Sequence, residues 1–91
     1  MYFMTINKIH QGVGPEEIGK VIPQHIQWIK EQISKGTIVQ AGKWGDSGGM
    51  LIMKANNITE AEGILSEDPL VKSGLISFGV ERFYPIVEIT L

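Results

Sequence analysis

The sequence predicts an α+β fold with the element order strand, helix, strand, strand, helix, strand. Three observations support this order. Residues 2–9, YFMTINKI, are rich in aromatic and β-branched types and read as a first strand. Isoleucines recur at helical spacing after Pro23, and the glycine-rich segment 43–49 joins two short apolar runs. This order is typical of the ferredoxin-like split βαβ fold (βαββαβ), which has a four-stranded antiparallel sheet with two helices on one face.

The length and composition predict one small domain over residues 1–91. A chain of 91 residues buries only about 60–65% of its unfolded surface, so its core is thin. Cysteine is absent, which excludes disulfides and thiolate metal sites, and two histidines alone do not suggest a structural zinc site. We therefore expect no metal and no cofactor, and self-association is the remaining way to bury more surface.

Several classes of protein are disfavoured by the sequence. The first residues do not have the pattern of a signal peptide, and no apolar stretch approaches the roughly 18 residues of a membrane span. The net charge is −2 and the lysines are scattered singly, which argues against nucleic acid as a partner. We expect a cytoplasmic domain, in keeping with the absence of cysteine.

The first helical region contains a proline. A short helix is predicted over residues 16–22, and Pro23 either kinks it or begins a new helix. The apolar stripe of the helix is predicted to be Ile22, Ile26, Ile29 and Ile33, and Gly36 is predicted to end it.

The rest of the chain supplies the remaining elements. Strands are predicted over 37–42, 50–55 and 75–84, with a possible short strand at 86–91 that could pair at an edge or with another subunit. A second helix lies within 57–69, capped by Thr59 with Glu62 completing a capping box, and it ends before Asp68 because Pro69 follows. Both helices cover one sheet face, so the other face is predicted to be covered by a second copy in a homodimer.

Two ionisable residues break the pattern and form the candidate catalytic pair. His25 lies on or beside the apolar face of its helix, and Asp68 lies between the second helix and the last strand. A carboxylate bonded to one ring nitrogen fixes the tautomer and leaves the other nitrogen free to move a proton near neutral pH. No Ser or Cys nucleophile motif accompanies them, so the chemistry they imply is proton transfer. The alternative remains that His25 is a satisfied core or interface residue and Asp68 a cap; His10 reads as a loop residue.

The segment AGKWGDSGGM, residues 41–50, lacks the glycine patterns of phosphate-binding loops. It is either a hairpin loop or a loop that closes a substrate pocket. In the second case Gly42, Trp44 and Ser47 would contact a small-molecule ligand, and Trp28 would help fill the space around His25.

The order of these motifs resembles the YCII-related (YciI-like) domain family of the dimeric α+β barrel superfamily. The resemblance is carried by PQHIQWIKEQISKGTIVQAG, GGMLIM, ITEAEGILSEDPLVKSGL and a final V-x-x-F, and it covers residues 1–84. It implies a ferredoxin-like fold, a dimer formed through the sheets, and His25 and Asp68 as the active-site pair. The resemblance also implies a link to such chemistry, because a few relatives resemble enzymes of aromatic degradation that act on ring substrates by elimination or isomerisation. Where the family often continues A-G-P, this chain has Lys43 and Trp44 after Gly42, which could add charge to a pocket and narrow it.

Three hypotheses remain open from the sequence. The first is an acid–base enzyme, of isomerase, lyase or hydrolase type, acting on a small and possibly aromatic metabolite. The second is a small-molecule-binding or regulatory module without turnover. The third is a structural dimer module in which His25 and Asp68 only hold two helices together.

Overall fold

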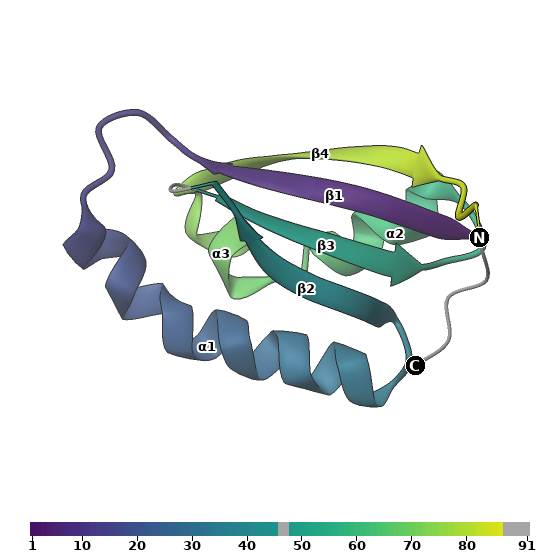
Figure 1. The fold of residues 1–91 in the computed structure, drawn as a ribbon. Helices are drawn as coiled ribbons and strands as arrows, with labels where there is room; N and C mark the ends of the chain where they lie inside the picture. The colour runs from purple at the N-terminus through teal and green to yellow at the C-terminus, as the bar shows by residue number, and fades with distance from the viewer. Residues whose placement is uncertain (46–47, 87–91) are drawn as a thin grey trace.

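The computed structural model describes residues 1–45 and 48–86, apart from the side chain of Trp44. Figure 1 shows the elements in their spatial arrangement. In chain order they are β1 (Tyr2–Ile9), α1 (Pro15–Ser34), β2 (Ile38–Trp44), β3 (Gly48–Lys54), α2 (Ile58–Leu65), α3 (Pro69–Ser73) and β4 (Ile76–Phe83). Among these residues no helix combines the length and apolar composition needed to cross a membrane.

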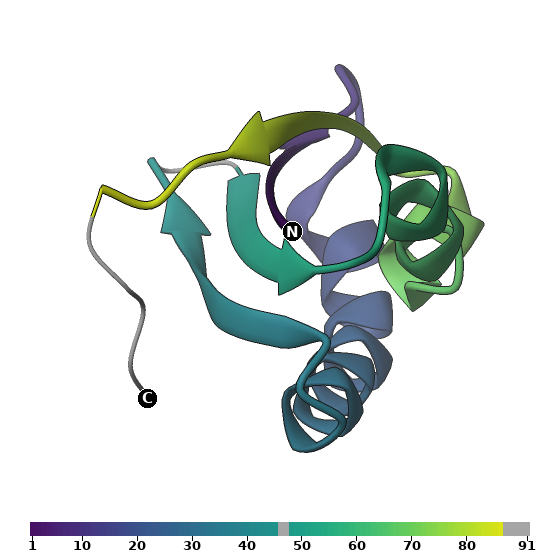
Figure 2. The same ribbon diagram turned by 90° about the vertical axis from the view of Figure 1, so that its right-hand side faces the viewer.

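The four strands form one antiparallel sheet in the order β2-β3-β1-β4. The α+β fold class and the antiparallel sheet are therefore as predicted. Figure 2 shows that the sheet is strongly curved and that the helices lie on one side of it. The described part of the chain has three helices where two were predicted, because the second helical region is divided at Asp68.

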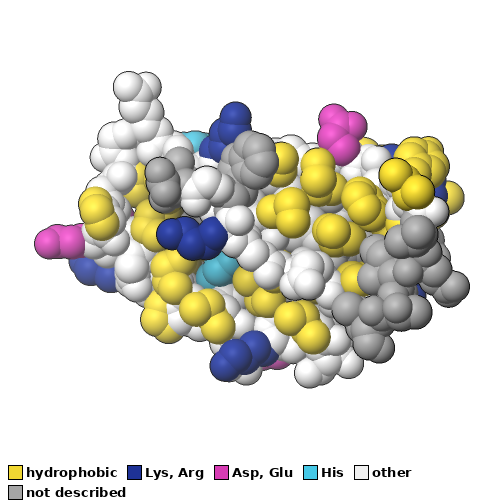
Figure 3. All heavy atoms as spheres, viewed as in Figure 1, with side chains coloured by type: hydrophobic (Ala, Val, Ile, Leu, Met, Phe, Trp, Pro, Cys, Tyr) yellow, Lys and Arg dark blue, Asp and Glu magenta, His cyan; other side chains and the backbone are white. Residues whose placement is uncertain are grey.

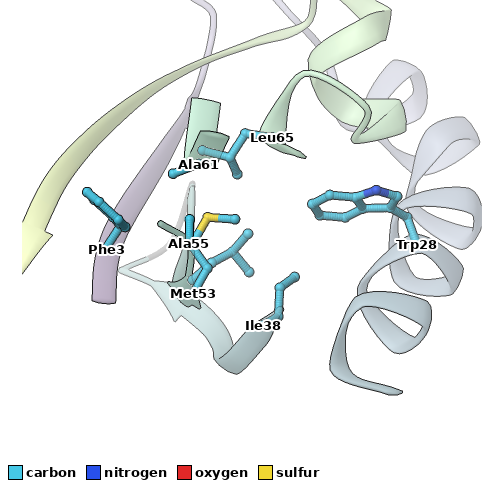
Figure 4. Close-up of a cluster of buried hydrophobic side chains, with 8 residues drawn as sticks. Phe3, Trp28, Ile38, Met53, Ala55, Ala61 and Leu65 are labelled. Carbon is cyan, nitrogen blue, oxygen red and sulfur yellow. The ribbon is translucent and has the colours of Figure 1, made fainter. Parts of the chain in front are cut away.

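The core lies between the sheet and the helices. Along β1, Phe3, Thr5 and Asn7 are buried on the helix-covered face, while the alternate side chains point to the other face. A cluster of buried hydrophobic residues fills the space between β1, β3 and the helices (Figure 4). Its members come from β1, α1, β2, β3, the residue that follows β3, and α2: Phe3, Trp28, Ile38, Leu51, Met53, Ala55, Ala61 and Leu65.

The first helix is continuous, which resolves the alternatives left open at Pro23. It begins with Pro15 at its first position and contains Pro23 in its interior. Proline has no N–H, so Pro23 cannot donate to the carbonyl of Gly19 one turn earlier. The helix nevertheless runs through this point, because its packing against the sheet outweighs the loss of one backbone hydrogen bond.

The predicted apolar stripe of α1 is only partly buried: Ile22 and Ile29 are half-buried, and Ile29 packs against the core. Ile26 and Ile33 are 45% and 50% exposed, whereas Trp28 and Gln32 are buried. The helix lies beside β2, the edge strand, and beside α3, so the face toward the core is rotated by about one residue from the isoleucine stripe. As a consequence His25, one turn before Trp28, points toward the interior.

The predicted cap of the second helix was wrong. Asn57, not Thr59, is the N-cap of α2, and its side chain accepts a hydrogen bond from the Glu60 N–H at 2.8 Å. Asparagine satisfies the free N–H groups of a helix start as well as threonine does. The short helix α3 then begins at Pro69, in a segment for which the sequence predicted no helix.

Smaller boundary differences affect the hairpin and the C-terminus. Strand β2 extends to Trp44 and β3 begins at Gly48, so the connection is shorter than the predicted loop 43–49. The predicted strand 86–91 falls outside the described residues except for Ile86, which is not in a strand.

Alanine substitutions at two glycines of the helical region should change the stability of the protein in opposite directions. Gly63 lies within α2 with open space around it, so Gly63→Ala should raise the free energy of unfolding by about 1 kcal/mol. Gly74 also has open space around it, but it ends α3 with a φ of 75°, in the left-handed region that disfavours residues with a Cβ. Gly74→Ala should therefore lower the free energy of unfolding by about 1–2 kcal/mol. Urea unfolding of both variants checks this; a loss of stability in Gly63→Ala contradicts the assignment of α2.

Candidate active site

The two predicted catalytic side chains lie in direct contact. His25 Nδ1 is 2.7 Å from Asp68 Oδ1, although the residues are 43 positions apart in the chain. His25 comes from the middle of α1, and Asp68 is the N-cap of α3. The contact exists because α1 and α3 pack side by side on the same face of the sheet.

Asp68 is held rigidly. Its Oδ1 also accepts a hydrogen bond from the Leu70 N–H at 2.9 Å, which is the capping interaction at the start of α3. Pro69 at the first helical position restricts the backbone of Asp68 to an extended conformation, with φ −62° and ψ 125°. The side chain is fully buried, and its second oxygen, Oδ2, has no hydrogen-bond partner among the described residues.

The geometry defines the roles of the two ring nitrogens of His25. A carboxylate oxygen only accepts hydrogen bonds, so Nδ1 donates to Asp68. In the neutral ring Nε2 is then unprotonated and can accept a proton. The ring is stacked with that of Trp28, at 6.5 Å between centroids and an interplanar angle of 21°, and its side chain remains 14% exposed.

His25 lines a cavity of about 610 Å³ between α1 and the sheet. Figure 3 shows hydrophobic side chains and a histidine around this hollow face of the molecule. The wall is mostly apolar, and its polar side chains are those of Asn7, His25 and Lys43. The hydrophobic side chains come from α1, the strands and α3: Ile9, Ile18, Ile22, Ile26, Ile29, Ala41, Met50, Leu51, Leu70 and Ile76.

The predicted pocket residues divide into three groups. Gly42 lines the cavity, and so does Lys43, whose charge was expected near a pocket. Trp28 lies in the hydrophobic core beside the His25 ring and is not among the lining residues, because the helix is rotated inward at this position. The side chain of Trp44 and the whole of Ser47 lie outside the described part of the structure.

Asn7 is the lining residue that the sequence analysis did not single out. It occupies a position on β1 that shares a face with Phe3 and Thr5, which are both buried. A polar amide at the end of this buried face was the available signal.

Within the described ranges, no three His, Cys, Asp or Glu side chains form a group that could hold a metal ion.

The fold and the cavity together define a class of protein. The chain is an α+β domain with a ferredoxin-like antiparallel sheet, and a mostly apolar cavity beside a buried His–Asp pair. The family model of the YCII-related domain matches residues 1–84, so the chain belongs to the YCII-related domain family.

Two solved structures share this fold. One is 5-chloro-2-hydroxyhydroquinone dehydrochlorinase (TftG) from Burkholderia phenoliruptrix AC1100 in complex with 2,5-dihydroxybenzoquinone. It has 24% identity and a TM-score of 0.77, over 92% of this chain and 94% of that chain. The other is muconolactone isomerase, with 13% identity and a TM-score of 0.74, over 99% of this chain and 97% of that chain. A search of curated proteins finds no match.

The contact between His25 and Asp68 can be measured through stability. Asp68→Ala removes the α3 cap and leaves Nδ1 without its acceptor, so it should cost about 2–4 kcal/mol. Asn57→Ala is the matched control, because it removes the α2 cap and touches no histidine; it should cost about 1 kcal/mol. Equal costs in urea unfolding would show that the histidine contributes nothing to holding Asp68.

Proposed function

We propose that this protein is an acid–base enzyme acting on a small, ring-shaped metabolite that has an enolisable carbonyl or a hydroxyl group. The observation that carries the proposal is the His25–Asp68 pair on the wall of a cavity, because the hydrogen bond uses Nδ1 and leaves Nε2 without a hydrogen-bond partner among the described residues. The volume, about 610 Å³, lies within the range of small-molecule sites.

The proposed reaction is a proton transfer through His25. Nε2 removes a proton from carbon next to a carbonyl group, and the C–H electron pair moves to form an enolate. The enolate then either takes the proton back at another carbon, which is isomerisation, or expels a leaving group, which is elimination. In both cases Asp68 keeps the ring oriented and stabilises its protonated form.

The wall of the cavity supports a flat and mainly apolar substrate. Isoleucine and leucine side chains make up most of it, and Lys43 adds one cation at its exposed edge. A deprotonated hydroxyl or carboxylate would interact favourably with that cation. The names of the two structural neighbours, a dehydrochlorinase bound to a dihydroxyquinone and a lactone isomerase, support ring substrates and these two reaction types.

We also propose that the protein is a homodimer formed through the sheet. The face of the sheet away from the helices carries half-buried hydrophobic side chains with no element of the described chain packed over them (Figure 2). Those on the inner strands are Tyr2, Met4, Ile6 and Ile52. A second copy of the same face would remove this apolar surface from water.

Proton transfer can be followed without knowing the physiological substrate. In D₂O the enzyme should exchange carbon-bound hydrogen of 2,5-dihydroxybenzoquinone or muconolactone for deuterium, detected by mass spectrometry. His25→Gln should slow the exchange at least 10²-fold, the usual contribution of a general acid–base group.

The second histidine provides the control. His10 is exposed and lies outside the cavity, so His10→Gln should leave the exchange rate unchanged. Equal rates in wild type and His25→Gln would contradict the proposal. Binding of these compounds to the wild type without exchange would instead identify a binding module.

The dimer is tested by a charge on the uncovered face. Ile52→Glu places a carboxylate between Met4 and Gln40 on adjacent strands, and the protein should become a monomer in sedimentation at micromolar concentration. Ile58→Glu on α2, which changes an exposed isoleucine away from the sheet face, should stay dimeric. A monomeric wild type contradicts the proposed assembly.

A further inference from the structure

We propose that Asn7 is a substrate-binding residue whose side-chain amide recognises an oxygen substituent, a hydroxyl or carbonyl group, on the ring of the substrate. The inference deepens the proposed function and rests on it for the position of the reacting carbon. It adds a requirement that His25 alone does not impose: the substrate must present a polar oxygen at the sheet side of the cavity while His25 acts from the helix side.

The first support is the burial of the side-chain carbonyl oxygen of Asn7. The residue is 5% exposed, and its Oδ1 has no hydrogen-bond partner among the described residues. A buried carbonyl oxygen without a partner destabilises the folded state, because it loses its hydrogen bonds to water and gains none. Such a group persists where another molecule supplies the missing partner.

The second support is where the amide lies. Asn7 is on the central strand β1 and lines the same cavity as His25. Its pairing partner on the adjacent strand β3 is Gly49, which also lines the cavity. A Cβ at position 49 would lie 4.0 Å from Asn7 Nδ2, an ordinary van der Waals contact, so position 49 borders the amide.

The chemistry of an amide fits an oxygen that is neutral or gains charge during reaction. The NH₂ group offers two donors and the carbonyl accepts, so a hydroxyl can be bound in either direction. When His25 removes a proton next to a carbonyl, negative charge develops on the carbonyl oxygen. An Nδ2–H directed at that oxygen stabilises it more strongly than it stabilises the bound substrate.

Thr5 allows the effect of ligand binding to be distinguished from the effect of burying a polar group. It lies two residues earlier on the same face of β1, is fully buried, and its Oγ1 also lacks a partner among the described residues. It is absent from the cavity wall. Thr5 is therefore a matched control: the same strand, face and lack of hydrogen bonding, but no access to a ligand.

The test compares two ring-shaped probes, hydroquinone and p-xylene, which carry two hydroxyl groups and two methyl groups at the same ring positions. Both are titrated by NMR into the wild type and the variants. The wild type should bind hydroquinone more tightly than p-xylene. Asn7→Leu should reduce this preference at least 10-fold, because it removes the amide and keeps a branched side chain of similar shape. It should also raise the melting temperature by about 5 °C, since an unpaired polar group leaves the interior.

Thr5→Val should raise the melting temperature in the same direction and leave the probe preference unchanged. The inference is overturned if the wild type shows no preference for hydroquinone, if Asn7→Leu retains the preference, or if Asn7→Leu lowers the melting temperature. A failure of the proposed acid–base function is distinguishable: deuterium exchange would be absent in the wild type, while the hydroquinone preference and its loss in Asn7→Leu would still be measured.

Discussion

The hydrogen bond between His25 Nδ1 and Asp68 Oδ1 is the interaction on which the site depends. The same carboxylate oxygen caps α3, so one atom fixes both the start of a helix and the tautomer of a histidine on another helix. Because Asp68 is buried and its backbone is restricted by Pro69, the ring of His25 is held by a rigid partner. In the proposed mechanism this rigidity matters, because a small displacement of the ring would misplace Nε2 relative to the substrate.

Near this pair, buried polar atoms without hydrogen bonds to the described residues lower the stability of the fold. Thr5 Oγ1, Asn7 Oδ1 and Asp68 Oδ2 are buried and have no hydrogen-bond partner within the described part of the chain. All three lie on the helix-covered side of the sheet or in the helical layer above it. Elsewhere this layer is packed with hydrophobic side chains (Figure 4). Each of these unpaired polar groups lowers the stability of the fold, and of the three residues only Asn7 lines the cavity.

Much of the fold could be predicted from the sequence because local patterns determine it. The alternation in residues 2–9, the two apolar runs around the glycine-rich segment, and the final strand each give one strand of the sheet. The pairing of His25 with Asp68 was also accessible, since the fold places the two helical regions on one face.

The predictions that failed concern which side chains are buried, because tertiary packing rather than local sequence determines this. Only part of the predicted isoleucine stripe of α1 is buried, because that helix packs at the sheet edge and against α3 rather than over the sheet centre. The same rotation places Trp28 in the core instead of the cavity. Asn7 was overlooked because a polar residue in a strand reads as solvent-exposed until the register shows which face it shares.

The most direct test of the central claim is the tautomer of His25, measured by long-range ¹H–¹⁵N NMR of the imidazole at a pH where the ring is neutral. The account predicts a protonated Nδ1 and an unprotonated Nε2, with this preference lost in Asp68→Ala. A ring protonated at Nε2, or one whose tautomer does not change when Asp68 is replaced, would contradict it.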